Sequence, residues 1–498
     1  MPNEIELKLR IAAADVPRLR RHGALKSQLV GKPITRKLTS IYYDTPDLEL
    51  LDAAISLRVR RMSGNWFQAV KGAGHSLAGL HQRMEWEDII ARGQPDFSKI
   101  TAPSLAAIFD AQSLRDALKP IFITEVNRAE WQLQYQDGSA IEVALDLGKL
   151  KVGKQEEDIS EIELELKHGK PRHLFELALA LQADIPLHIE NVSKAQRGYA
   201  HYRATQLSTS KAKPIVLSSK VKVAAAFQMI GWECLRQLQA NQDMVLHGND
   251  CEGVHQMRIA MRRLRVALKL FKREHEDIKA ELDWLGSLLG IARDWDVLLQ
   301  ETLPAADSHA NGKLHILEEA IKKARQRAYS KLKTAMNSQR YQKLLLTLGA
   351  LLENDDKPAH KKLLPFAHGH LQKGFEKLNT YTKLSDLDTE QRHKTRIAVK
   401  NLHYTADFFA SLNQTKKRVR KQQSFLQKLN QVQKLLGIMN DAATTEKLLQ
   451  LLTHKQSVAD IHEAANILLK WNVERSAATH QSLDSNWHSL IQAKPYWS

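Results

Sequence analysis

Hydrophobic and polar residues alternate with a period of two in several short segments of residues 1–203. In "EIELKLR" (4–10), Ile5, Leu7 and Leu9 alternate with charged residues. The other segments are "SLRVRR" (56–61), "WFQAVKG" (66–72), "HQRMEWE" (81–87), "IEVALDLG" (141–148) and "SEIELELK" (160–167). A period of two is typical of β-strands that bury one face, so this region is predicted to fold mainly as an antiparallel sheet. Helices are expected only in stretches such as 103–118 and 171–183.

The polar face of these strands is dominated by charged residues, and the charges are sorted by sign. The carboxylates are Glu4, Glu6, Glu85, Glu87, Glu142, Asp146, Glu161, Glu163 and Glu165, and the bases are Lys8, Arg58, Arg60, Lys71 and Arg83. One explanation is a solvated, charged face, as in many antiparallel sheets. The sorting favours a second explanation, a closed barrel whose lumen is lined by these groups. In such a wet tunnel, carboxylates hold Mg²⁺ or Mn²⁺ and bases hold phosphate oxygens.

Residues 220–498 have a different pattern, that of long amphipathic helices. Two segments match at an offset of 138 residues, "HQMRIAMRRLRVALKLF" (255–271) and "HKTRIAVKNLHYTADFF" (393–409), and "LGIARD" (289–294) matches "LGIMND" (436–441). These matches indicate an internal duplication and predict two similar helical bundles. The hydrophobic stripe of the first segment is Met257, Met261, Leu264, Leu268 and Phe271, and its copy is Val399, Leu402, Ala406 and Phe409.

A basic stripe runs beside the hydrophobic stripe in both copies. It consists of His255, Arg258, Arg262, Arg265 and Lys269, and then of His393, Arg396, Lys400 and His403. A single basic stripe is usually a solvated face, but two at corresponding places predict a basic groove. Replacing Arg258, Arg262 and Arg265 is therefore expected to weaken polyanion binding more than replacing Lys322, Lys323 and Arg325, which lie in the mixed stretch "EEAIKKARQR" (318–327).

Net charge divides the chain into the same two parts. Residues 1–205 contain 28 Lys and Arg against 27 Asp and Glu, a net of +1, whereas residues 206–498 have a net charge of +16. This asymmetry predicts a polyanionic partner for the second part. The stretch "ATQLSTSKAKPIVLSSK" (204–220) has the composition of an exposed linker.

Other features bound the class of protein. The two cysteines, Cys234 and Cys251, form no metal or disulfide motif. The chain shows no signal peptide and no apolar run long enough to span a membrane, so we expect a cytoplasmic protein without a membrane partner. Aromatic residues make up 6% of the chain, and no RNA-binding signature is present, so a nucleic-acid partner is not expected.

The N-terminal strands also carry a family resemblance. Glu4-x-Glu6-x-Lys8 resembles the ExExK signature of the CYTH, or triphosphate tunnel metalloenzyme, superfamily. The resemblance continues in order through "IYYDTPDLEL" (41–50), "LRVRR" (57–61), "AVKG" (69–72), "RMEWE" (83–87), "EVALDLG" (142–148), "SEIELEL" (160–166) and "SKAQRGY" (193–199). It implies an eight-stranded antiparallel tunnel that hydrolyses or cyclises triphosphate compounds with Mg²⁺ or Mn²⁺.

The resemblance implies roles for single residues. Glu4 and Glu6 resemble metal ligands, completed by carboxylates of the 160–167 strand. Glu161, Glu163 and Glu165 share one face, so the pair that binds metal stays open, with Glu163 in either pair. The implied triphosphate ligands are Lys8, Arg58, Arg60, Lys71, Arg83, Arg128 and Lys194, and the candidate catalytic residues are Glu4, Glu6, Lys8, Arg58 and Arg60. Glu85, Glu87, Glu142 and Asp146 would orient the bases or bind a second metal.

The implied reaction requires no nucleophilic side chain. Bases clamp a linear triphosphate, one metal neutralises its oxygens, and a second metal activates the water that attacks a terminal phosphorus and releases phosphate and pyrophosphate. The sequence contains no G-x-x-x-x-G-K-[ST] loop of an ordinary nucleotide triphosphatase.

The second half resembles the CHAD domain, most specifically in "VHQMRIAMRRLRVAL" (254–268). CHAD domains are helical and are implicated in binding inorganic polyphosphate. In the second repeat, His403 stands where an Arg would be expected and Asn401 replaces a base, so this half-site is expected to be weaker or more sensitive to pH.

The sequence thus predicts an α+β protein with a β-barrel tunnel (1–203), a linker (204–219) and an all-α domain (220–498) with repeats at about 220–350 and 360–498. The leading hypothesis is an inorganic triphosphatase with an appended polyphosphate-binding domain. The alternatives are an ATP-directed adenylate cyclase or nucleoside triphosphatase, and a non-catalytic polyphosphate-binding adaptor.

Overall fold

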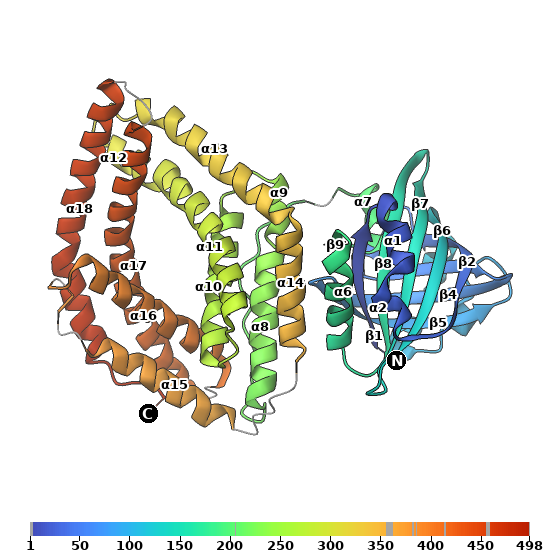
Figure 1. Ribbon diagram of the computed structural model, residues 1–498. Coiled ribbons are helices and arrows are strands. Elements are labelled where there is room, and N and C mark those ends of the chain that lie inside the picture. Colours follow the sequence, from blue (N-terminus) through green and yellow to red (C-terminus); the bar gives the residue numbers. More distant parts are fainter. Residues whose placement is uncertain are drawn as a thin grey trace. The chain divides into compact units, whose positions relative to one another are not determined.

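The computed structural model describes residues 3–204, 206–354, 362–380, 383–384, 386–412, 415–454 and 459–497. The chain divides into two compact units, both visible in Figure 1. Unit 1 comprises Met1–Gln206 and Asn337–Asn354, and unit 2 comprises Leu207–Met336 and Asp355–Ser498. Unit 1 is therefore discontinuous in the sequence.

Unit 1 is built around an antiparallel sheet. The strands are β1 (Asn3–Ile11), β2 (Leu29–Asp44), β3 (Ser56–Met62), β4 (Asn65–Leu77), β5 (Leu80–Ile90), β6 (Lys119–Gln134), β7 (Ala140–Val152), β8 (Gln155–His168) and β9 (Leu187–Ile189). Their order is β5-β4-β3-β2-β6-β7-β8-β1-β9, and β1 also pairs with β5. The described residues thus contain nine strands where the sequence predicted eight, because the three-residue β9 adds to the edge of β1.

Tight turns join the first strands of this sheet. Ser63 and Gly64 connect β3 to β4, and Ala78 and Gly79 connect β4 to β5; all four residues have positive φ angles. Positive φ at both central residues is the geometry of a type I′ turn, whose twist matches that of the flanking strands.

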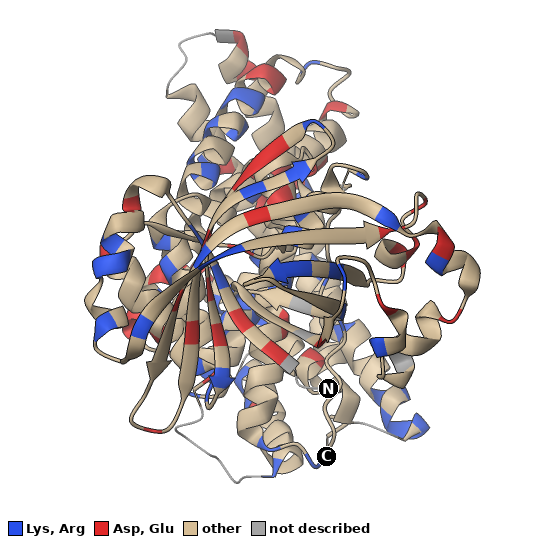
Figure 2. Cartoon of the chain, turned by 90° about the vertical axis from the view of Figure 1, so that its right-hand side faces the viewer, with Lys and Arg blue, Asp and Glu red and all other residues tan. Residues whose placement is uncertain are grey.

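The alternating pattern of the strands is confirmed by burial. Leu7 and Leu9 of β1, Leu57 and Val59 of β3, and Leu164 of β8 are fully buried. On the other face of the sheet, charged side chains follow β1, β3 and β8 at the intervening positions. Figure 2 shows acidic and basic positions along the strands.

Short helices surround the sheet of unit 1. They are α1 (Val16–Arg21), α2 (Gly23–Lys26), α3 (Glu49–Asp52), α4 (Pro103–Ala106), α5 (Gln112–Ala117), α6 (Arg172–Asp184), α7 (Lys194–Ala200) and α14 (Gln339–Leu352). The two helical stretches expected in this region correspond to α4 with α5 and to α6. Helix α14 comes from the middle of the helical half of the sequence and packs on α6 and β9.

In the described residues of unit 2 the regular structure is helical, apart from one isolated bridge between Lys222 and Lys362. Its helices are α8 (Val223–Gln239), α9 (Gln242–His247), α10 (Glu252–Leu270), α11 (Glu276–Val297), α12 (Leu303–Asp307), α13 (Ile316–Met336), α15 (Leu363–Leu378), α16 (Thr389–Phe408), α17 (Lys416–Thr453) and α18 (Ala459–Ile491). The predicted order of a sheet region followed by a helical region is confirmed.

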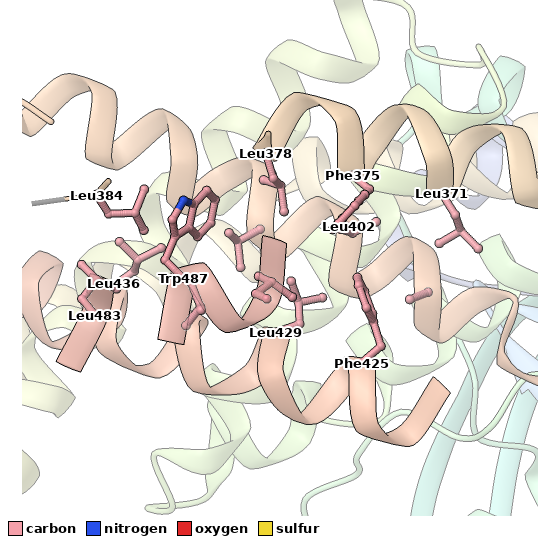
Figure 3. Close-up of a cluster of buried hydrophobic side chains, with 14 of the residues drawn as sticks. Leu371, Phe375, Leu378, Leu384, Leu402, Phe425, Leu429, Leu436, Leu483 and Trp487 are labelled. Atoms are coloured by element: carbon pink, nitrogen blue, oxygen red, sulfur yellow. The ribbon is translucent and has the colours of Figure 1, made fainter. Parts of the chain in front are cut away.

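The two sequence repeats occupy equivalent helix pairs in unit 2, α10 with α11 and α16 with α17. The hydrophobic stripes are buried in both: Met257 and Leu264 in α10, and Val399, Leu402 and Ala406 in α16, are at most 2% exposed. In Figure 3, Phe425 of α17 and Trp487 of α18 belong to the core that forms around the second repeat. No helix in the described part of the chain is long and apolar enough to span a membrane.

Candidate functional site: a charged cavity in the sheet and a basic cluster in the helices

The sheet of unit 1 encloses a cavity of about 820 Å³, which we call the sheet cavity. Its lining includes Glu4, Glu6, Lys8, Arg58, Arg60, Lys71, Glu85, Glu87, Arg128, Glu142, Glu163, Glu165 and Lys194. Most of the residues that the sequence singled out therefore lie around one space. The alternation of the strands brings them there, because every second side chain of β1, β3 and β8 points to the same face.

One group of charges in the sheet cavity is centred on Glu163 of β8. Its carboxylate accepts hydrogen bonds from Lys8 Nζ at 2.7 Å, Lys194 Nζ at 2.9 Å and Arg128 Nη2 at 2.5 Å. Arg128 also bonds both oxygens of Asp146, at 2.7 and 2.6 Å. Three bases thus converge on Glu163, but Lys194 also pairs with Asp146 and Glu161 and Lys8 with Glu6, so the charges of this group are balanced within the protein.

Burial and opposite charge shape the protonation of this group. Burial raises the pKa of Glu163, but Lys194, Lys8 and Arg128 outweigh burial and hold that pKa well below its usual value. Burial also raises the pKa of Asp146, but Arg128 and Lys194 outweigh burial and lower that pKa to about 2. The group is therefore fully ionised near neutral pH.

A second group of charges joins β1, β3, β4 and β5. Lys71 Nζ lies 2.9 Å from a carboxylate oxygen of Glu4 and 2.9 Å from one of Glu85. Arg58 donates to Glu87 at 3.1 Å and lies 3.6 Å from Glu85. Lys71 and Glu85 are directly paired in the register of β4 with β5, which explains their contact.

Arg60 is a base of the sheet cavity that has a hydroxyl group, and not a carboxylate, as its hydrogen-bond partner. It donates from Nε to Ser40 Oγ at 3.0 Å, and no ion pair joins it to a carboxylate within the described ranges. Burial lowers the pKa of Arg60 to about 10, and repulsion from Arg58 and Arg128 acts in the same direction. The surroundings of Arg60 are thus positive and buried, and an anion placed there would relieve this repulsion.

The pKa of the buried Tyr42 also indicates a positive electrostatic potential in the sheet cavity. Burial raises the pKa of its phenol, but the bases Arg58, Arg60, Lys194 and Lys71 outweigh burial, and the pKa lies below its usual value. The phenol oxygen therefore marks a place in the sheet cavity where negative charge is favoured.

Carboxylates gather at another part of the sheet cavity. Glu6 and Glu165 are directly paired between β1 and β8. Burial raises the pKa of Glu165; the hydrogen bond and charge of Lys167 oppose this rise, while Glu4 and Glu142 add to it. The mutual influence of three carboxylates indicates a local excess of negative charge.

The three glutamates of β8 have different surroundings. Glu163 and Glu165 line the sheet cavity, whereas Glu161 does not. Glu161 is 1% exposed and is bonded by Lys194 and Arg197 of α7. Asp146 is likewise fully buried and outside the lining. Among the alternatives left open by the sequence, the geometry therefore favours Glu163 with Glu165.

The donor set fits a hard divalent cation. Glu4, Glu6, Glu163 and Glu165 supply only carboxylate oxygens, the ligands that Mg²⁺ and Mn²⁺ prefer. A buried acidic cluster also exists at Asp146, Glu161 and Glu163, where one oxygen of each lies within 4.8 Å of the others. Asp146 and Glu161 of that cluster are paired with Arg128, Lys194 and Arg197 and lie outside the cavity lining, so Glu163 is the member of the cluster that can join the lining carboxylates.

Some residues that line the sheet cavity were not predicted from the sequence, and the side chain of one predicted residue, Arg83, is not described. The unanticipated lining residues include Lys32, Arg36, Tyr42, Glu130 and Lys167. Lys32 and Arg36 lie on β2 before the "IYYDTPDLEL" match, and even numbers of residues separate them from Tyr42. Because residues at even spacing share one face of a strand, this spacing could have predicted them. The side chain of Arg83 lies outside the described residues; its backbone is paired with Glu4.

In unit 2, four bases of the two stripes form what we call the basic cluster: Arg258 and Arg262 of α10, and Arg396 and Lys400 of α16. Burial lowers the pKa of Arg262 to about 10, and Arg258 and Arg396 contribute to this shift. Burial, followed by repulsion from Arg262, Arg396 and Arg258, lowers the pKa of Lys400 to about 6, against the partial opposition of Asp441. Repulsion within the cluster thus helps to lower the pKa values of Arg262, Arg396 and Lys400, and the cluster is a site of high positive potential.

The other members of the stripes lie elsewhere. Lys269 and His393 are exposed. Arg265 donates to Leu282 O at 2.5 Å and lies 2.7 Å from Asp283 of α11. Burial lowers the pKa of His403, whose charged neighbours are Asp407 and Arg263, outside the basic cluster. The pKa of His255 is lowered by burial, then by Arg293, and also by Arg262 of the basic cluster, against the opposition of Glu252 and Glu301.

The duplicated "LGI" motifs supply features that the stripes alone did not reveal. Arg258 donates to Gly290 O at 2.8 Å and to Asp294 at 3.2 Å, and a Cβ on Gly290 would lie 3.3 Å from its guanidinium. Asp441 is the equivalent of Asp294 and acts on Arg396 through its charge. The acids that balance the basic cluster therefore come from α11 and α17, and no i+4 pattern on α10 could have shown them.

Comparisons with known proteins identify both regions. The model of the CYTH domain matches residues 2–199, and that of the CHAD domain matches residues 230–450. The structure of the CHAD domain from Ricinus communis is 32% identical with a TM-score of 0.53, covering 58% of this chain and 99% of that one. The chain belongs to the CHAD family, and a region that matches the CYTH domain precedes its CHAD domain. The resemblance inferred from the motifs is confirmed.

Two further relatives resemble the first half. An inorganic triphosphatase of Haemophilus influenzae is 35% identical over 201 residues, which are 40% of this chain and 55% of that protein. The chain thus spans about half the length of this curated relative. The structure of a putative adenylyl cyclase from Hippeastrum, described as having a dominant triphosphatase activity, is 15% identical with a TM-score of 0.29. The match covers 40% of this chain and 96% of that one.

Proposed function

We propose that the sheet cavity is a tunnel in which inorganic triphosphate is hydrolysed to pyrophosphate and phosphate. The observation that carries this proposal is the surroundings of Arg60, a half-buried base next to Arg58 and Arg128 with no ion pair to a carboxylate among the described residues. A triphosphate is a linear polyanion, and its oxygens suit the fork of Arg. The identity with the Haemophilus inorganic triphosphatase over this region supports the same reaction.

The tunnel in this proposal consists of the eight strands β1–β8, with the β1–β5 pairing completing the ring. Its proposed domain is residues 1–203, followed by a linker (204–219) and the helical domain (220–498). Arg58, Arg60, Lys8, Arg128 and Lys194 bind the phosphates, since they surround the positive part of the cavity. Lys71 is paired with Glu4 and Glu85, so it orients carboxylates as well as substrate.

Glu4, Glu6, Glu163 and Glu165 would hold the divalent cation, Mg²⁺ or Mn²⁺, which would neutralise phosphate oxygens and activate water. Glu4, Glu6 and Glu165 belong to the carboxylate-rich part of the cavity, whereas Glu163 lies among the bases Lys8, Lys194 and Arg128. Glu163 has a further role, because it holds Lys8, Lys194 and Arg128 in place through direct hydrogen bonds.

In the same proposal, the basic cluster binds inorganic polyphosphate. Its bases are crowded enough to lower the pKa values of Arg262 and Lys400, so a polyanion would gain more there than on a diffuse basic surface. The net charge of +16 over residues 206–498 acts in the same direction.

The test is phosphate release by the full chain from tripolyphosphate, ATP and long-chain polyphosphate, with Mg²⁺, Mn²⁺ or a chelator present. We expect tripolyphosphate to be the preferred substrate and the chelator to stop the reaction. The variant Arg60→Gln should lose most of the activity. Arg61→Gln is the matched control, because Arg61 is exposed on the outer face of the same strand, over the Trp66 ring. Equal rates for the two variants would overturn the role of Arg60, and a preference for ATP would favour the nucleotide-directed alternative.

A further inference from the structure

The edge strand β9 is held by a helix that comes from the other half of the sequence. The backbone N–H groups of Leu187 and Ile189 donate to the side-chain oxygens of Gln339 and Gln342, each at 3.0 Å. Both glutamines lie on the first turn of α14. A sheet edge normally leaves such N–H groups to solvent or to another strand. Here two side-chain amides take the place of a neighbouring strand.

The rest of α14 is fitted closely to unit 1. Gln182 of α6 donates to the side-chain oxygen of Gln339 at 3.3 Å. A Cβ placed on Gly349 would lie 2.2 Å from the Phe175 ring of α6, so only glycine permits this approach. Gln342 is 5% exposed. Residues 337–354 therefore belong to unit 1 by packing, although they lie within the 230–450 range that matches the CHAD domain.

From β9, hydrogen bonds lead directly to the bases of the sheet cavity. Glu190 N donates to Lys8 O at 2.9 Å, so the residue after β9 fixes the backbone of a cavity base. His81 of β5 is 2.9 Å from Glu190 O, and Asn191 accepts from Gly79 N at 2.9 Å. Ser193 then caps α7, whose first residue is Lys194. A shift of β9 would therefore move both Lys8 and Lys194.

We propose that Gln339 and Gln342 of α14 are positioning residues for the triphosphate site, acting through β9 on Lys8 and Lys194. This inference rests on the proposed binding of triphosphate in the sheet cavity. It makes residues 337–354 a functional part of that site, which a domain ending near residue 203 would lack.

The decisive variants are made in the full chain at Gln342, whose oxygen is the acceptor for Ile189 N–H. Gln342→Met removes this acceptor at almost constant volume, whereas Gln342→Glu retains an acceptor oxygen. The matched control is Gln237→Met, because Gln237 is a buried glutamine of unit 2 whose amide bonds Gln256 at 2.8 Å. Tripolyphosphate affinity is measured by calorimetry with a chelator present, and KM and kcat are measured with Mg²⁺.

We expect Gln342→Met to weaken tripolyphosphate binding by about 3- to 10-fold, the range for loss of one buried hydrogen bond, and to raise KM more than it lowers kcat. Gln342→Glu should restore the affinity, and Gln237→Met should leave it unchanged. Wild-type affinity in Gln342→Met, no rescue by Glu, or an equal loss in Gln237→Met overturns the positioning role alone. A wild-type chain that binds no tripolyphosphate overturns the proposed function, and with it this inference.

Discussion

Lys400 makes polyphosphate binding a proton-linked reaction that can be measured. With the basic cluster empty, burial and the neighbouring Arg262, Arg396 and Arg258 hold the pKa of Lys400 at about 6, so its amine is mostly neutral at pH 7.5. A bound phosphate chain would bring negative charge to the same place and favour the ammonium form. Binding near neutral pH should therefore take up a proton at Lys400.

The size of this effect follows from Coulomb's law. One phosphate charge about 4 Å from the amine is worth ~4 kcal/mol at an effective dielectric constant of about 20, which corresponds to ~3 pKa units. The pKa of Lys400 would rise from about 6 to roughly 9, giving an uptake of ~0.9 proton near pH 7.5. Because the free group has the lower pKa, the affinity rises as the pH falls from about 9 to about 6, by up to ~10-fold per pH unit, and levels off below.

The assay is calorimetric titration of the full chain with long-chain polyphosphate in two buffers of different ionisation enthalpy. The difference in apparent enthalpy gives the number of protons taken up. Lys400→Arg keeps the charge but stays protonated throughout, so it should bind with almost no proton uptake and a flat pH dependence in this window. Lys400→Met should bind more weakly and also without uptake.

Other titratable groups lie near the basic cluster, among them His255, whose pKa is lowered in part by Arg262. Asp294 and Asp441 are the carboxylates that act on it, from α11 and α17, and Tyr404 lies beside Arg262. Burial raises the pKa of Asp441 and that of Tyr404. Proton uptake that is equal in wild type and Lys400→Arg would refute the reasoning, because the proton would then bind at another group.

Three further outcomes are expected. Glu6→Gln should abolish phosphate release from tripolyphosphate with unchanged circular dichroism, since it removes a carboxylate charge from the proposed metal site at constant volume; turnover at saturating Mg²⁺ would remove Glu6 from that site. Arg58→Ala should raise KM or lower kcat without altering the Mg²⁺ dependence, and a shifted metal requirement with normal substrate kinetics would contradict our division of bases and acids. Gly349→Ala should lower the free energy of unfolding of unit 1 by roughly 1–3 kcal/mol, because the added methyl overlaps the ring of Phe175. A thermal denaturation midpoint equal to that of wild type would contradict this close packing of α14 on α6.

The parts of the structure that the sequence predicted are those governed by local periodicity. The period-two pattern of "EIELKLR" places Glu6 and Lys8 on the cavity face and buries Leu7 and Leu9, as observed. The stripe that includes Met257 and Leu264 is buried because a 3.6-residue period puts its members on one side of the helix. In these cases the sequence neighbours determine the environment.

Partners that come from distant segments could not be predicted in this way. Arg325 belongs to a mixed, apparently exposed stretch, yet it donates to the fully buried Asp296 at 2.6 Å and lies over the Tyr329 ring. It is therefore unsuitable as a neutral comparison for the basic cluster, and the exposed Lys323 and Arg327 serve better.

The same limit applies to the glutamates of β8. The period of two puts Glu161, Glu163 and Glu165 on one face, but α7 arrives from thirty residues downstream in the sequence and covers Glu161 with Lys194 and Arg197. A strand pattern gives the direction of a side chain and not the element that covers it.

The discontinuity of unit 1 bears on how the protein emerges from the ribosome. The first segment of unit 1 ends at Gln206, but the segment that contains its last helix ends at Asn354, about 150 residues later. At about 5–20 residues per second this separation lasts roughly 7–30 s. During that time the edge of β9 and the face of α6 that receives Gly349 have no covering helix, so a nascent sheet is open to pairing with other chains. Synthesis rate and chaperone supply should therefore affect the yield of this unit more than they affect a sheet domain encoded without interruption.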